Sequence, residues 1–143
     1  MEKNDMKKIT KQWLFSKGFQ KCTEKAYSGI GYFYPQSDFD IIFLFDKNRF
    51  NENYFIDVGF RLHDETQSWG TVRTNMPLGN YGFYYEQWEK QDYIACLEEI
   101  YELYIQPYFD LGVAMLKKIV KKPSFRGQDY LIHRNAFEKI RKM

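Results

Sequence analysis

The chain has little cysteine and little histidine, two residues of each among 143. A structural zinc site needs about four nitrogen or sulfur ligands, and Cys22 and Cys96 lie far apart, with none of the spacings of a metal or redox motif. The run of residues 63–65 (His-Asp-Glu) follows a predicted strand, where neighbouring side chains point to opposite faces and cannot converge on one ion. We therefore expect no metal site, no cofactor and two reduced thiols.

Motifs of nucleophilic catalysis and of phosphate binding are missing as well. There is no G-x-S-x-G sequence and no P-loop, and residues 29–31 (Gly-Ile-Gly) lack the third glycine and the following helix of a dinucleotide-binding turn. Cys22 would need His63 or His133 beside it to act as a nucleophile, and nothing in the local sequence indicates such a pair. An enzyme is thus the less favoured class of protein, although it stays open.

Long apolar runs are also absent. The longest candidate, residues 41–45, is bracketed by Asp40 and Asp46 and is far shorter than the ~20 residues of a membrane span. Residues 1–11 are charged and lack the apolar core of a signal peptide. These features predict a cytoplasmic protein that does not enter the membrane.

Aromatic side chains, in contrast, are abundant: 13 Phe, 12 Tyr and 3 Trp. Apolar residues make up 44% and charged residues 28%, which is typical of globular proteins, and the length suits a single domain. Tyr and Trp bury a large apolar body while one polar atom still needs a partner, so they suit core edges and binding surfaces. We expect most of these aromatic residues in the core.

The spacing of apolar residues predicts helices at both ends of the chain and strands between them. We expect a helix over 5–17, strands over 26–34, 38–46, 54–62 and 71–76, a last strand or packed loop within 77–88, and helices from 90 onward, broken at Pro107 and Pro123, the last over 129–142. Grouped strands predict an α+β fold: an N-terminal helix, an antiparallel sheet of 4–5 strands, and C-terminal helices packed on one face.

One face of that sheet is expected to be polar. Alternation over 54–62 places Asp57 and Arg61, with His63 just beyond, opposite the apolar side chains. Asp38 and Asp40 of the neighbouring strand can join them. Paired carboxylates can perform acid–base chemistry or bind Mg²⁺, although ion pairs on a solvated sheet are the commoner outcome. Asp57, Arg61 and His63 are therefore candidates for a small-molecule site or a catalytic site.

Charge is segregated along the chain. The balance is +4 over residues 1–35, −9 over 36–110 and +7 over 111–143. Such a pattern arises from helix faces that neutralise one another, or from patches that steer an oppositely charged partner. The lysines at 117, 118, 121 and 122 can contact nucleic acid, but aromatic residues are not interleaved among them, which disfavours a nucleic-acid partner.

Residues 81–104 combine many aromatic residues with acidic ones. Aromatic anchors surrounded by acids are typical of surfaces that bind a basic protein. Tyr93, Ile94 and Tyr104 instead follow the apolar face of a helix and are expected in the core. The predicted partner-binding residues are Tyr81, Tyr84, Tyr85, Glu86, Trp88 and Glu89.

Two stretches resemble a bacterial family defined as domain of unknown function 4304. Residues 13–21 (WLFSKGFQK) look like the family's helix–GF–K/R opening, and residues 53–60 (NYFIDVGF) look like its Y/F-x-I/V-x-V/I-G strand. Several such small α+β proteins are suspected of protecting bacteria from their own toxins. The resemblance implies no catalytic residues. It favours a non-catalytic protein-binding domain, most concretely an immunity protein that neutralises a basic toxin.

Overall fold

The computed structural model describes residues 1–23, 30–64, 68–75, 82–125 and 127–143. The N-terminal part contains α1 (Lys3–Ser16), β1 (Gln20–Lys21), β2 (Ile30–Pro35), β3 (Phe39–Lys47), β4 (Tyr54–Leu62) and β5 (Trp69–Arg73). The C-terminal part contains β6 (Gly82–Phe83), the 3-10 turn η1 (Tyr85–Gln87), α2 (Lys90–Ile100), the π-helical turn η2 (Tyr101–Ile105), α3 (Gln106–Leu111), α4 (Val113–Lys121), β7 (Ser124–Phe125), β8 (Gln128–Asp129), β9 (Leu131–Ile132) and α5 (Arg134–Arg141).

The main sheet is antiparallel, with the order β1-β2-β3-β4-β5-β9, and β6 pairs with the start of β4. The α+β prediction is confirmed, and the short strands β1, β6 and β9 extend the expected sheet. β9 lies inside the segment predicted as the last helix, and that part of the prediction was wrong. Gly127, with a φ of +77°, turns the chain, and residues 131–132 pair with β5 before α5 begins.

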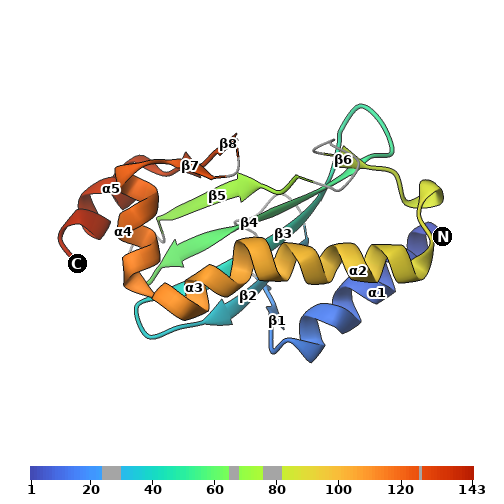
Figure 1. Ribbon diagram of the computed structural model, residues 1–143, viewed down its shortest axis with the longest axis horizontal. Coiled ribbons are helices and arrows are strands. Elements are labelled where there is room, and N and C mark those ends of the chain that lie inside the picture. Colours follow the sequence, from blue (N-terminus) through green and yellow to red (C-terminus); the bar gives the residue numbers. More distant parts are fainter. Residues whose placement is uncertain (24–29, 65–67, 76–81, 126) are drawn as a thin grey trace.

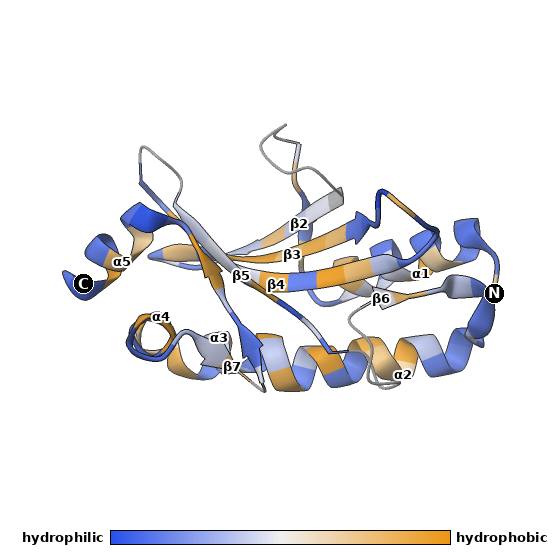
Figure 2. Ribbon diagram, turned by 90° about the horizontal axis from the view of Figure 1, so that it is seen from above, coloured by the Kyte–Doolittle hydropathy of each residue, from blue (hydrophilic) through white to orange (hydrophobic). Residues whose placement is uncertain are grey.

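The helices cover one face of the sheet. Figure 2 shows α2, α3 and α4 on the same side of the strands, and Figure 1 shows α1 and α2 near one another over them. The apolar side of β3 (Phe39, Ile41, Phe43 and Phe45) is buried there, as its alternation predicts. Burial of each such side chain contributes roughly 1.5–3 kcal/mol. This layer fixes which sides of α1 and α2 remain exposed.

The chain changes direction between α3 and α4. Pro107 lies in the first turn of α3, where its missing N–H costs no helical hydrogen bond. Gly112 then adopts a φ of +55°, a conformation that favours glycine, and α4 starts on a new axis. The predicted interruption at Pro107 thus becomes a π-helical turn followed by a bend at Gly112. In the part of the chain that the structure describes, no helix combines the length and apolarity needed to cross a membrane.

Candidate functional site

The polar face of the sheet contains a buried ion pair. Arg61 donates from Nε and Nη2 to Oδ2 of Asp40, at 3.1 and 2.8 Å, and His63 Nε2 lies 2.7 Å from Oδ1 of the same carboxylate. Asp40 and Arg61 are only 5% and 7% exposed. The register of β3 and β4 places these two residues directly opposite each other. Both carboxylate oxygens are therefore occupied by groups of the fold itself.

Asp57 belongs to a second, separate network. It accepts hydrogen bonds from Arg73, at 3.0 Å from Nε and 3.3 Å from Nη2, and these two residues are opposite each other across β4 and β5. Burial raises the pKa of the Asp57 carboxyl, and the Arg73 guanidinium partly opposes that rise. The Arg73 guanidinium also lies 4.0 Å from the centre of the Phe55 ring. Asp57 therefore does not share a hydrogen-bond network with Arg61 and His63, with which the sequence grouped it on one polar face.

The cysteines and histidines have structural surroundings. Cys96 is buried, which raises the pKa of its thiol to about 12 and makes the thiolate inaccessible at neutral pH. His133 accepts a hydrogen bond from the backbone N–H of Asn135 at the start of α5, and His63 contacts Asp40. Among the described residues, no three His, Cys, Asp or Glu side chains gather in a group that could hold a metal ion. None of these contacts assembles a nucleophile with a base.

The segment predicted to bind a partner is partly exposed and partly buried. Trp88 is only 9% exposed, because its ring packs against Phe83 of β6 and its carbonyl oxygen accepts a hydrogen bond from the backbone nitrogen of Met1 at 2.7 Å. The expectation that Trp88 is exposed was therefore wrong. Tyr84 and Tyr85 are half-buried, with ring centres 5.0 Å apart. Glu86 and Glu89 are exposed, and Tyr81 lies outside the described residues.

α2 presents an acidic face to solvent. Tyr93, Leu97 and Ile100 fill the core, and the opposite side of the helix carries an exposed set. Ile94 is 41% exposed within this set, so its predicted burial was wrong. Ile94 lies about 100° around the helix from Tyr93, at the edge of the buried stripe. This angular offset is the sequence signal from which its exposure could have been predicted. We define the acidic face as Glu89, Asp92, Ile94, Glu99 and Glu102.

The carboxylates of this face lack cationic partners. Glu98, beside it, accepts a hydrogen bond from the Trp13 indole at 2.7 Å and pairs with Lys17 at 3.0 Å, and these contacts hold the pKa of Glu98 below its usual range. The other acidic residues on α2 and next to it in sequence differ from Glu98 because they have no such cationic partner in the described chain. Within the described ranges, no ion pair involves the following residues: Glu86, Glu89, Asp92, Glu99 and Glu102.

The basic C-terminal region is a distinct surface. Lys117, Lys118, Lys121 and Lys122 are exposed on α4 and, as far as the structure describes the chain, form no ion pair. Lys139 and Asp64 are 2.8 Å apart and join the basic end to the acidic middle, but the acids of α2 and the lysines of α4 do not pair. Ion pairing between α2 and α4 therefore explains little of the charge segregation along the chain.

The acidic face of α2 thus differs from the polar face of the sheet, because its carboxylates form no ion pair among the described residues. No protein-family model, curated protein or solved structure matches the chain.

Proposed function

We propose that the protein is a non-catalytic binding domain that takes a basic protein partner on the acidic face of α2. The observation that carries the proposal is a set of exposed carboxylates along the solvent side of α2 that form no ion pair within the described chain, with the exposed side chain of Ile94 at the edge of that side. On the sheet face, in contrast, Asp40 pairs with Arg61 and Asp57 pairs with Arg73, so these charges have partners within the fold. The face of α2 is the surface that a partner would complete.

The physical roles of the residues follow from their exposure. Carboxylates on a rim steer an oppositely charged protein and raise its association rate, while a central apolar residue supplies binding energy when water is excluded. Ile94 is an exposed apolar side chain at the edge of this face, one helical turn before Glu98, and suits the second role. Tyr84 and Tyr85 precede α2 and add half-exposed aromatic area next to Glu86.

The partner class that we propose is a bacterial toxin. A nuclease toxin must bind phosphates and therefore carries basic residues around its active site. A domain that covers those residues with carboxylates neutralises the toxin without chemistry of its own. The resemblance of residues 13–21 and 53–60 to family 4304 supports this reading.

The test measures binding to the proteins encoded next to this one, by calorimetry with purified components. Reversal of two charges, Glu99→Lys with Glu102→Lys, should weaken binding of the partner about 100-fold, because like charges across an interface cost several kcal/mol. Ile94→Asp should weaken it further.

The matched control reverses two exposed charges on the other helix, Lys117→Glu with Lys121→Glu. This variant should bind the partner as the natural sequence does. A partner whose affinity is unchanged by the α2 reversals, or is reduced equally by the α4 reversals, would show that the acidic face is not the binding surface.

A further inference from the structure

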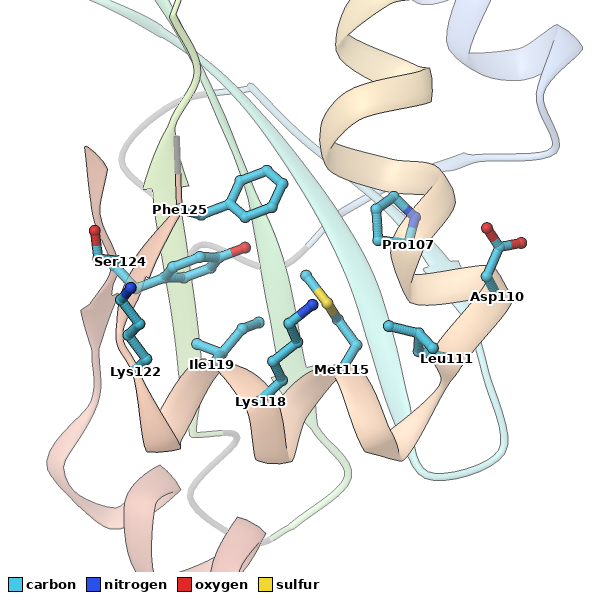
Figure 3. A pocket seen from close by; sticks show the side chains of 10 residues that line it. Pro107, Asp110, Leu111, Met115, Lys118, Ile119, Lys122, Ser124 and Phe125 are labelled. Atoms are coloured by element: carbon cyan, nitrogen blue, oxygen red, sulfur yellow. The ribbon is translucent and has the colours of Figure 1, made fainter. Parts of the chain in front are cut away.

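A pocket of about 370 Å³ lies at the bend between α3 and α4, beneath the β7 strand. Its walls are mainly apolar and come from Pro107, Leu111, Met115, Ile119, Phe125 and Tyr130. Figure 3 shows Met115, Lys118 and Ile119 rising from α4 into the space between Phe125 and Pro107. The volume is within the range of sites for small molecules, about 300–1,000 Å³.

The pocket exists because the bend at Gly112 separates two helices that would otherwise form one rod. α4 buries Leu116 and Val120 in the core, while Leu111, at the end of α3, remains 45% exposed at the mouth of the pocket. Phe125 closes one side and packs edge-on against Tyr104 of the π-helical turn, with ring centres 5.4 Å apart. The apolar walls are thus held by the fold rather than by a flexible loop.

Two tyrosine hydroxyls supply a hydrogen-bond donor at this site. Tyr108 is fully buried, and its hydroxyl lies 3.1 Å from that of Tyr130, which lines the pocket. Burial raises the pKa of Tyr130 to about 12 and raises that of Tyr108 well above its ordinary value, so both hydroxyls keep their protons at neutral pH. A buried hydroxyl must use its proton, and Tyr130 is the partner in reach of Tyr108 within the described chain. Either hydroxyl can donate across this contact, and when Tyr108 donates to Tyr130, the proton of Tyr130 is left for an acceptor in the pocket.

Positive charge lies on one side of the same space. Lys118 and Lys122, one helical turn apart, line the pocket and form no ion pair among the residues described. Asp110 lies at the other end from Lys122 (Figure 3), and its carboxylate accepts a hydrogen bond from Gln106 at 2.9 Å. The two lysines thus lie along the α4 side of the pocket, from its middle to the end away from Asp110 (Figure 3), while most of its walls are apolar.

We propose that this pocket binds a small amphipathic anion. An apolar body, aromatic or branched aliphatic, packs against Met115, Ile119 and Phe125. An acidic head group, such as a carboxylate or a sulfonate, accepts the Tyr130 hydroxyl proton and lies between the ammonium groups of Lys118 and Lys122. The pocket shares no residue with the acidic face of α2, so binding of a small anion and binding of a protein partner can be tested separately.

Two fluorescent probes with nearly the same body separate the charge from the apolar contact. One is 8-anilinonaphthalene-1-sulfonate, and the other is N-phenyl-1-naphthylamine, which lacks the sulfonate. The folded protein should bind one equivalent of the sulfonate at least about tenfold more tightly than the neutral probe, because only the sulfonate can accept a charge-assisted hydrogen bond from Tyr130 and attract the two ammonium groups. Equal affinities, or no binding of the sulfonate, would overturn the proposal.

Variants then locate the probe. Lys118→Met with Lys122→Met should remove most of the tenfold preference, and Tyr130→Phe should weaken the sulfonate about threefold or more without affecting the neutral probe. Lys117→Met with Lys121→Met, a pair with the same spacing that does not line the pocket, should leave both affinities unchanged. A control pair that weakens the sulfonate as much as the lining pair does would place the probe elsewhere and contradict the proposal.

A pocket-filling variant gives an independent readout. Ile119→Trp should reduce the affinity for both probes, since the added ring occupies the apolar volume. Each variant is compared only after its thermal unfolding is shown to be cooperative, because loosely packed states also bind the sulfonate. Undiminished binding of both probes to a folded Ile119→Trp variant would also refute the assignment.

Discussion

Removal of the Asp40 carboxylate should destabilise the protein strongly, because Arg61 would remain buried without its partner. The two side chains are joined by bonds of 2.8 and 3.1 Å, and each is less than one-tenth exposed. Breaking a buried ion pair by removing one member typically costs 3–5 kcal/mol. For a chain of this length, Asp40→Ala should therefore lower the thermal midpoint by about 10–15 °C.

The assay is a double-mutant cycle of chemical denaturation with Asp40→Leu, Arg61→Met and both together. Each single variant leaves one buried charge, whereas the double variant leaves none and should recover most of the lost stability. Asp57→Ala is the comparison, because Arg73 is 41% exposed in its side chain and can be hydrated when its partner is gone. Asp57→Ala should lower the free energy of unfolding by less than Asp40→Ala does. If the free energy of unfolding of Asp40→Ala lies within about 0.5 kcal/mol of that of the natural protein, the ion pair does not stabilise the fold. The polar face of the sheet would then again be a candidate ligand site.

Other predictions concern the backbone, the thiols, the tyrosines and the exposed acids. Gly59→Ala should cost about 3 kcal/mol or more of unfolding free energy in denaturant titration, because its Cβ would lie 1.8 Å from the carbonyl oxygen of Gly70. A thiol reagent at pH 8 should modify Cys22 in the folded protein and reach Cys96 only on unfolding, since Cys96 is buried and its pKa is about 12; equal rates would contradict its burial. Burial raises the pKa of Tyr130 to about 12, so its contribution to stability should be constant below pH ~10 and be lost as pH rises toward 12, and the alkaline fall in stability should be less steep in Tyr130→Phe; equal slopes in the two proteins would contradict this. Glu99→Gln with Glu102→Gln should change stability by less than about 0.5 kcal/mol, because neither acid forms an ion pair with any residue that the structure describes.

The parts of the fold that could be predicted are those with strong local periodicity. The strict alternation of residues 54–62 gave β4 with its observed bounds, and the apolar run of 38–46 gave β3 within one residue. The grouping of these strands between helices then required an α+β fold. In each case the signal lies within a single element, where burial of one face decides the conformation.

The remaining features depend on contacts between elements. Residues 131–132 have no strong strand pattern of their own and are extended because β5 offers them an open edge. Trp88 is buried because β6 and the start of α1 close over it, which its neighbours in sequence do not indicate. Asp57 pairs with Arg73 through the β4–β5 register, and a register cannot be read from one strand alone.

The candidate binding surfaces, like the fold, could be predicted only in part from the sequence. The acidic character of the middle of the chain is visible in the sequence, but the lack of ion pairs that makes Glu99 and Glu102 available appears only in the folded arrangement. The α3–α4 pocket was missed, although Pro107 and Gly112 mark the bend that creates it. The approach of Tyr108 to Tyr130 has no local signal, because it depends on how the hairpin of β7 and β8 returns to α3.

The dependence of partner affinity on salt tests the proposed function most directly. The dissociation constant for the protein partner would be measured at about 50 and 300 mM salt for the natural chain and for a variant with Glu89→Gln, Asp92→Asn, Glu99→Gln and Glu102→Gln. A surface that steers a basic protein predicts affinity that falls with salt in the natural chain and is weak and nearly independent of salt in the variant. The same salt dependence in both proteins would contradict the acidic face as the binding surface.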